Sequence, residues 1–117
     1  MKYVCNTFTL SMLHLPEAGE EKDYLLRIKN IADKNEIKEH LEKSQSAVGH
    51  QGTVDLINTL FGTNIPLNRV EIKLDKGDEL LVSQLMVRLP EGKVLSKEEM
   101  EDLYKTGKVK FLLLKVL

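Results

Sequence analysis

Residues 46–62 have the sequence SAVGHQGTVDLINTLFG, in which a turn of small residues leads into a short helix. The first three residues, Ser46, Ala47 and Val48, form a run that is too short, with side chains that are too small, to be an element of the core. Gly49 after them permits a positive φ. Gly52 and Thr53 supply the N-cap of the helix. The apolar positions then fall at helical spacing: Val54, Ile57, Leu60 and Phe61. Gly62, just past them, is a natural C′ residue, so we predict one buried helix of about two to three turns.

The start of this helix is a candidate anion site. The first backbone N–H groups of a helix have no partner within it and carry the positive end of its dipole, so they can hold a phosphate without a basic side chain. His50 lies at the edge of that site. We therefore predict that this stretch forms the active site.

Composition limits the classes of protein to which such a site can belong. The 117 residues are enough for one domain with a core of its own. Seventeen Lys and Arg residues against eighteen Asp and Glu give a net charge of −1, which argues against broad binding of duplex DNA. The single Cys5 excludes an internal disulfide and indicates a buried thiol in a reducing compartment. With no apolar run near the ~20 residues of a membrane span and no signal peptide, we expect a cytoplasmic protein without membrane contact.

The remaining patterns predict an α+β fold. Strands are expected at 2–5, 24–28, 70–74, 80–89 and 108–117, with one helical turn near 11–13. Residues 33–43 form a charged surface helix, and Ser96 with Glu99 is a capping-box pattern that opens a helix ending near Gly107. Strands 70–74 and 80–89 should pair as a hairpin across the turn at 76–78. We predict a single domain over residues 1–117, with a mixed sheet of about five strands flanked by helices.

Three further polar residues are candidates beside the histidine. Arg69 begins the predicted hairpin, Arg88 stands near the end of its apolar strand, and Glu91 lies in the following Pro-Gly turn. An arginine among apolar neighbours snorkels to solvent, pairs with a carboxylate, or faces a ligand cleft, and structural pairing is the commonest of these. A glutamate in such a turn is usually solvated, and a lone histidine in a turn is more often structural than catalytic. His14 and His40 offer no metal-binding spacing, so we expect no metal.

Several short motifs occur together in a characteristic order. They are Asn6-x-Phe8, Gly49-His50-x-x-Thr53, Asn58-Thr59-Leu60-x-Gly62-Thr63, Asn68-Arg69-Val70-Glu71, Gly77-Asp78-Glu79 and Arg88-Leu89-x-Glu91-Gly92-Lys93-Val94-Leu95-Ser96. In this order and spacing the chain resembles the viral ring nuclease family, the type III CRISPR antagonists of archaeal viruses and phages. The resemblance covers residues 48–117 well and the first ten residues loosely, whereas residues 14–45 show no match.

The resemblance implies an anti-CRISPR enzyme without a cofactor. Such a protein is a small homodimer that binds cyclic tetra-adenylate and cuts it without metal into linear di-adenylate with a 2′,3′-cyclic phosphate. Loss of this messenger silences type III CRISPR signalling in the host cytoplasm. By the same resemblance, His50, Arg88 and Glu91 are catalytic, and Arg69 contacts the ligand.

The residue chemistry is consistent with that implication. The ribose 2′-OH of an RNA-like phosphodiester is its own nucleophile, so cleavage needs a set geometry, a stabilised phosphorane and a proton for the departing 5′-oxygen. His50 suits the general acid, Arg88 offers a bidentate fork to the phosphorane, and Glu91 acts as base or orients its neighbours. A two-fold symmetric ring also matches a C₂ dimer.

The ligand-binding residues fall into two groups. The turn residues Gly49, Gln51, Gly52 and Thr53 are expected at the phosphate. Gly52 stands where relatives usually carry Ser, so phosphate binding depends more on backbone N–H groups and on the Thr53 hydroxyl. Adenine selection is expected from the first loop, at Asn6, Thr9 and Ser11.

Two other functional classes stay open. A non-catalytic sponge or sensor would hold the same cyclic oligoadenylate without cutting it, so His50→Ala would keep its function. A structural or interaction protein that dimerises through its apolar strands would show no stabilisation by nucleotide at all.

Overall fold

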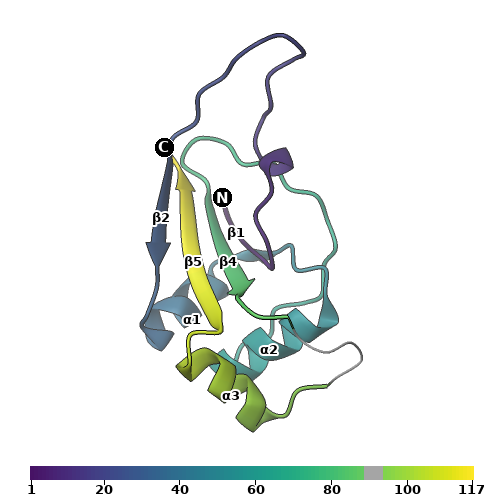
Figure 1. The fold of residues 1–117 in the computed structure, drawn as a ribbon, viewed down its shortest axis with the longest axis vertical. Coiled ribbons are helices and arrows are strands. Elements are labelled where there is room, and N and C mark those ends of the chain that lie inside the picture. Colours follow the sequence, from purple (N-terminus) through teal and green to yellow (C-terminus); the bar gives the residue numbers. More distant parts are fainter. Residues whose placement is uncertain (89–93) are drawn as a thin grey trace.

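A five-stranded mixed sheet runs through the computed structural model, which describes residues 1–88 and 94–117 (Figure 1). The strands are β1 (Lys2–Cys5), β2 (Leu26–Asn30), β3 (Gln45–Ser46), β4 (Glu79–Leu85) and β5 (Val109–Val116). The helices are the 3-10 turn η1 (Leu10–Met12), α1 (Lys34–Glu42), α2 (Gln51–Phe61) and α3 (Lys97–Lys105). The strand order is β2-β5-β4-β1-β3, with β1 parallel to β3 and β4, and β5 antiparallel to β2 and β4. The predicted α+β class and five-stranded mixed sheet are confirmed.

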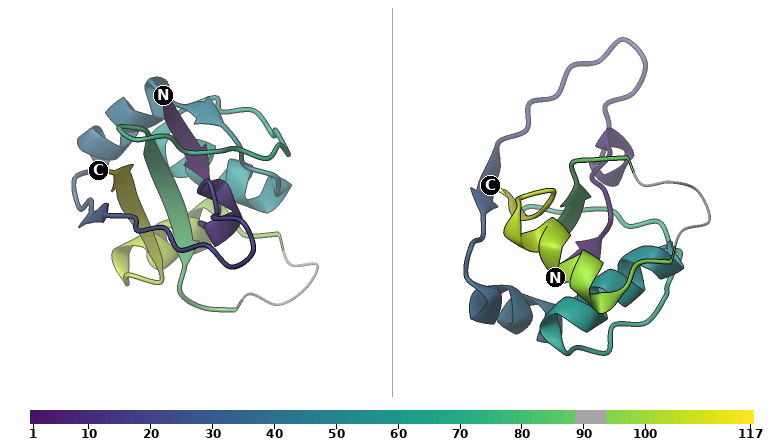
Figure 2. Two further views of the ribbon diagram at one scale, coloured as in Figure 1. Left: turned by 90° about the horizontal axis from the view of Figure 1, so that it is seen from above. Right: turned by 60° about the horizontal axis from the view of Figure 1, so that its bottom comes forward.

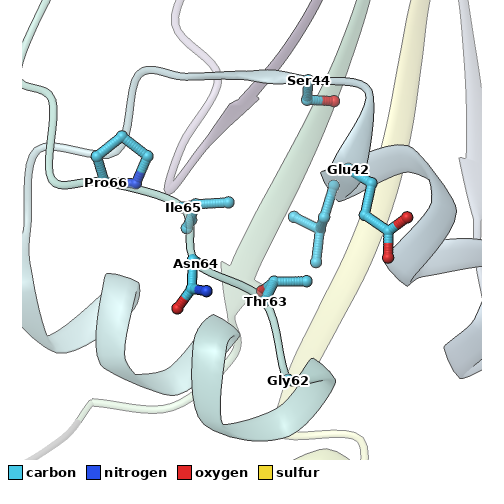
Figure 3. A pocket seen from close by; sticks show the side chains of 8 residues that line it. Glu42, Ser44, Gly62, Thr63, Asn64, Ile65 and Pro66 are labelled. Atoms are coloured by element: carbon cyan, nitrogen blue, oxygen red, sulfur yellow. The ribbon is translucent and has the colours of Figure 1, made fainter.

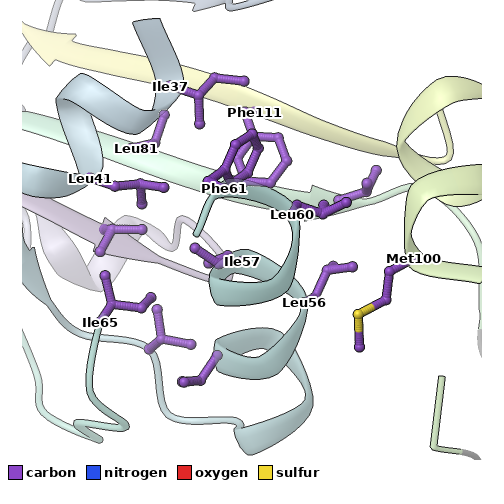
Figure 4. Close-up of a cluster of buried hydrophobic side chains, with 14 of the residues drawn as sticks. Ile37, Leu41, Leu56, Ile57, Leu60, Phe61, Ile65, Leu81, Met100 and Phe111 are labelled. Atoms are coloured by element: carbon purple, nitrogen blue, oxygen red, sulfur yellow. The ribbon is translucent and has the colours of Figure 1, made fainter. Parts of the chain in front are cut away.

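The three α-helices pack against one face of this sheet and form the main core. Side chains of a strand alternate between its two faces, so Leu81 of β4 and Phe111 of β5 point toward the helices. The ring of Phe61, from α2, meets the ring of Phe111 edge-on with centroids 4.9 Å apart. Figure 4 shows this pair surrounded by aliphatic side chains of α1 and α2, with Met100 of α3 at the edge of the cluster.

Loops, not helices, cover the opposite face. Cys5 is 5% exposed there, so the predicted buried thiol is confirmed. Leu74 packs into the same cluster, and its N–H donates to Met12 O at 2.7 Å. Residues 15–23 form a long excursion that projects away from the rest of the chain in Figure 1 and in the right view of Figure 2. No helix among the described residues is long and apolar enough to cross a membrane.

The predicted hairpin of strands 70–74 and 80–89 is wrong. β4 pairs with β1 on one side and β5 on the other, so no edge of β4 remains for residues 70–74, which run as an irregular segment over the loop face. The fifth strand is instead the two-residue β3. Ala47 and Val48 directly after it are 4% and 0% exposed, so this run does belong to the core, because neighbouring β1 buries it. β4 also ends at Leu85, four residues before the predicted end.

The predicted helices are confirmed. Asp33 caps α1 by accepting the Asn35 N–H at 2.8 Å. Ser96 and Glu99 form the predicted capping box of α3, and Gly107 beyond it has φ 72°. β2 begins two residues later than expected, because its pairing with β5 sets its start at Leu26.

Candidate functional site

The carboxyl ends of three parallel strands meet at one edge of the sheet. Asn6 follows β1, the turn with His50 follows β3, and Arg88 comes three residues after β4. In Figure 1 the arrowhead of β4 points toward α2, which begins at the same edge. Ligands of parallel sheets bind outside the carboxyl ends of their strands, next to helix N-termini. The topology therefore selects this edge as the candidate site.

His50 is the N-cap residue of α2. Its backbone is extended, with φ −124° and ψ 123°, and its carbonyl oxygen accepts the N–H groups of Thr53 and Val54 at 3.2 and 3.1 Å. The imidazole makes no capping hydrogen bond and is exposed, so it is available to a ligand. The predicted cap at Gly52 and Thr53 is thus too late by two residues, because the helix already begins at Gln51.

This earlier start moves the predicted anion site two residues closer to His50. The backbone N–H groups of Gln51 and Gly52 have no acceptor in residues 1–88 and 94–117. Both belong to the first turn of an 11-residue helix, where the dipole favours negative charge. The predicted C′ residue Gly62 is confirmed at the other end, with the left-handed φ of 64°.

Arg69 lies on the turn that carries His50. A Cβ atom added to Gly49 would stand 2.9 Å from the Arg69 Cγ and 3.3 Å from its Cβ, so the arginine stem packs directly on this glycine. Asn68 holds the segment in place, since its N–H donates to Val48 O and its side-chain amide donates to Ser46 O, both at 2.9 Å. The Arg69 guanidinium is exposed and forms no ion pair or hydrogen bond within the described residues. Arg69 is thus a cation beside the N-terminus of α2, without an anionic partner among the residues that the structure describes.

A cavity of about 570 Å³ opens next to the same turn. Its polar rim comes from the start of α2: His50, Gln51, Gly52, Thr53 and Asp55. The rest of its lining is apolar apart from one serine: Leu56, Ser83, Leu85, Val94, Leu95 and Met100. The Gln51 side-chain amide donates to an Asp55 carboxylate oxygen at 2.8 Å, which fixes both groups at the rim.

Two polar residues of this cavity, Asp55 and Ser83, escaped the sequence analysis. Asp55 could have been found from its i, i+4 spacing to Gln51 on a predicted helix. Ser83 gave only a weak signal, a serine within an apolar strand.

The loop residues predicted to select adenine lie apart from this cavity. Thr9 Oγ1 and Ser11 Oγ are exposed and lie 2.8 Å apart, bonded to each other. Asn6 is half-buried, and its side-chain oxygen accepts a long bond of 3.7 Å from the Cys5 thiol. Asn6 follows β1 at the carboxyl edge, whereas Thr9 and Ser11 belong to the η1 turn on the opposite face of the sheet, and none of the three lines the cavity.

Arg88 lies in different surroundings from those predicted. Because β4 ends at Leu85, Arg88 is exposed, and its neighbours Met86 and Val87 are 54% and 36% exposed. No ion pair or hydrogen bond joins Arg88 to His50 or to another described residue. Glu91 lies outside the described residues.

A second cavity, of about 370 Å³, lies at the other end of α2 (Figure 3). It is bounded by the end of α1 and the turn after α2, and it contains none of the predicted site residues. Within the described parts of the chain, no three His, Cys, Asp or Glu side chains come together as metal ligands would.

Fold and sequence together place this chain in a family of archaeal viral proteins. It belongs to the STIV B116-like family, whose model matches residues 2–111. B116 of Sulfolobus turreted icosahedral virus superimposes with a TM-score of 0.78 at 35% identity, over 97% of both chains. Protein 26 of a Sulfolobus islandicus filamentous virus is 40% identical over 88% of this chain and 84% of its own length. ORF117 of Acidianus two-tailed virus is 32% identical over 83% of this chain and 88% of its own.

Proposed function

We propose that this protein is a metal-independent ring nuclease that binds cyclic tetra-adenylate at a dimer interface and cleaves it. The observation that carries the proposal is the turn before α2. It combines an exposed histidine, two backbone N–H groups without an acceptor in the described residues, and an arginine without an anionic partner there. Such a turn suits a phosphodiester, which needs both charge neutralisation and a proton donor.

The proposed reaction needs no water or metal as nucleophile. The 2′-oxygen of one ribose attacks the adjacent phosphorus, forming a 2′-O–P bond as the bond from phosphorus to the 5′-oxygen breaks. The His50 imidazolium gives its proton to that 5′-oxygen, and the 2′-OH proton leaves to Glu91 or to solvent. Arg88 carries a guanidinium that can neutralise the phosphorane. Each cut yields a 2′,3′-cyclic phosphate and a 5′-OH, and two opposite cuts yield two di-adenylates.

A dimer completes this proposal. The ring has a two-fold axis, so a C₂ dimer presents one His50 turn to each of two opposite phosphates. No ion pair or hydrogen bond ties Arg88 to the His50 of the same chain, and a two-fold arrangement allows it to reach either phosphate.

The test is incubation of wild type and His50→Ala with labelled cyclic tetra-adenylate in EDTA, read by chromatography. Linear tetra-adenylate and single-stranded RNA serve as control substrates. We expect His50→Ala to lose about 10²–10⁴ of the cleavage rate and to keep binding, because general acid catalysis supplies that range. Tight binding without cleavage by both proteins would instead indicate a non-catalytic sponge or sensor. Absence of binding by wild type would reject the proposal.

A further inference from the structure

The lining of the cavity at the start of α2 contains one buried polar group without a hydrogen-bond partner in the described part of the chain. Ser83 is 4% exposed, and its Oγ has no hydrogen-bond partner in residues 1–88 and 94–117. Ser83 stands between Leu81 and Leu85 on β4, so its side chain shares their face of the sheet and points toward the helices. Buried hydroxyls are nearly always paired, and an unpaired one destabilises the fold. The Ser83 hydroxyl can therefore donate to, and accept from, a ligand in this cavity.

The other residues of the cavity indicate what kind of ligand could bind to the Ser83 hydroxyl. Leu56, Leu85 and Met100 form apolar walls, and Met100 can adapt to a ligand because its side chain is unbranched. At the rim, Asp55 carries a carboxylate of which one oxygen already accepts from Gln51. Apolar walls with a few fixed polar groups are the usual lining of a small-molecule pocket. The volume of about 570 Å³ is ample for a flat heterocycle.

We propose that this cavity binds one adenine base of the ring, an inference that rests on the proposed function. The helix N-terminus and Arg69 then hold the phosphate outside, while the base passes between α2 and α3. The Ser83 hydroxyl bonds a ring nitrogen, and the free Asp55 oxygen accepts from the exocyclic amine. Insertion of a base into a side pocket also separates that base from its neighbours, as happens in enzymes that turn a base out of the stack.

The first test uses Ser83→Ala, which separates a role of this hydroxyl in ligand binding from a role in stability. The proposal predicts weaker binding but no loss of stability. Binding of cyclic tetra-adenylate is measured by calorimetry in the His50→Ala background, which prevents turnover. We expect Ser83→Ala to weaken binding about tenfold, whereas its melting temperature without ligand stays equal or rises, because an unsatisfied hydroxyl is removed. Ser83→Val, which also fills the cavity, should weaken binding further.

The matched control is Ser44→Ala in the second cavity, where the hydroxyl donates to His40 O at 2.5 Å. This variant should bind the ring like its parent. Equal affinity of Ser83→Ala, Ser83→Val and the parent would overturn the adenine pocket and leave the ring nuclease proposal intact. Absence of binding by the parent and by wild type would overturn both.

A second ligand tests the contact with Asp55. Cyclic tetra-inosinate has the same ring but a carbonyl oxygen in place of the exocyclic amine, so it faces the carboxylate with an acceptor. It should bind at least tenfold more weakly than cyclic tetra-adenylate, and Asp55→Ala should remove most of that preference. Equal affinity of the parent for both rings would reject Asp55 as the group that selects adenine.

Discussion

The two ends of α2 each border a cavity, but their polar groups differ. At the C-terminal end, the Asn58 side chain donates to Ile65 O at 3.0 Å and accepts from the Thr63 hydroxyl and the Ile65 N–H at 2.9 Å. At the N-terminal end, the first two helix N–H groups, the Arg69 guanidinium and the Ser83 hydroxyl all lack partners in the described residues.

This difference teaches that a cavity by itself does not mark a functional site in this protein. The cavity at the end of α2 lies beside a turn that the hydrogen bonds of Asn58 and Ser44 hold in place. Folded proteins satisfy their buried polar groups wherever only stability is at stake. The donors at the start of α2 that lack partners in the described residues therefore distinguish the cavity for which we propose a ligand.

The largest effect on stability should come from the C-terminal end of α2, where the side chain of Asn58 makes three hydrogen bonds. Asn58→Ala leaves the Ile65 N–H and C=O and the Thr63 hydroxyl without their partner, so we expect a loss of about 2 kcal/mol or more in the free energy of unfolding. Cleavage of cyclic tetra-adenylate, measured below the melting temperature, should stay near wild type. The neighbouring Thr59→Ala is the control and should change stability little. Normal stability together with lost cleavage in Asn58→Ala would contradict the view that the C-terminal end of α2 serves stability and not function.

Two glycines at the N-terminal end of α2 should respond in opposite ways to substitution by alanine. In Gly49→Ala the new Cβ would meet the Arg69 Cγ at 2.9 Å, so the arginine must shift, and we expect ring binding to weaken roughly three- to tenfold. In Gly52→Ala the new Cβ has no atom within 4 Å, and alanine favours the helix by about 0.5–1 kcal/mol. Melting curves and ring titrations of both variants check this. Similar binding by the two would mean that the packing of Arg69 on Gly49 has no function in ligand binding.

The smallest effect should be a pH dependence of stability that arises at Asp78, away from both ends of α2. Burial raises the pKa of the Asp78 carboxyl, but hydrogen bonds from the Asp75 N–H and the Met1 ammonium, with the charge of the latter, outweigh it and hold this pKa below its ordinary value. Because the folded state favours the carboxylate, this stability is present above the unfolded pKa of about 3.9 and is lost as the pH falls through the lower folded value.

Asp78→Asn should therefore cost about 1 kcal/mol at pH 7, and the difference from wild type should shrink between about pH 4 and pH 2. Urea unfolding at several pH values measures this difference, with the exposed Asp23→Asn as control. A difference that stays constant down to pH 2 would contradict the assigned pKa direction. Unchanged cleavage by Asp78→Asn at pH 7 would show that this carboxylate, like Asn58, contributes to stability and not to function.

The sequence was a reliable guide wherever local chemistry decides the structure. The Ser96–Glu99 capping box, the apolar spacing of α2 and its left-handed Gly62 all act within a few residues, so they could be predicted. The start of α2 was placed two residues late because a lone histidine is a weak cap signal, whereas the extended backbone at His50 ends the turn there.

What the sequence determined by itself is an α+β domain with a histidine next to a helix N-terminus, because hydrophobic periodicity and capping are local properties. The positions of β4 between β1 and β5 and of Arg69 on Gly49 follow only from the tertiary structure. The same is true of Ser83, which lies behind α2 with no partner for its hydroxyl in the described residues. These contacts join residues far apart in the chain, and their energy comes from packing and burial that no short stretch of sequence encodes.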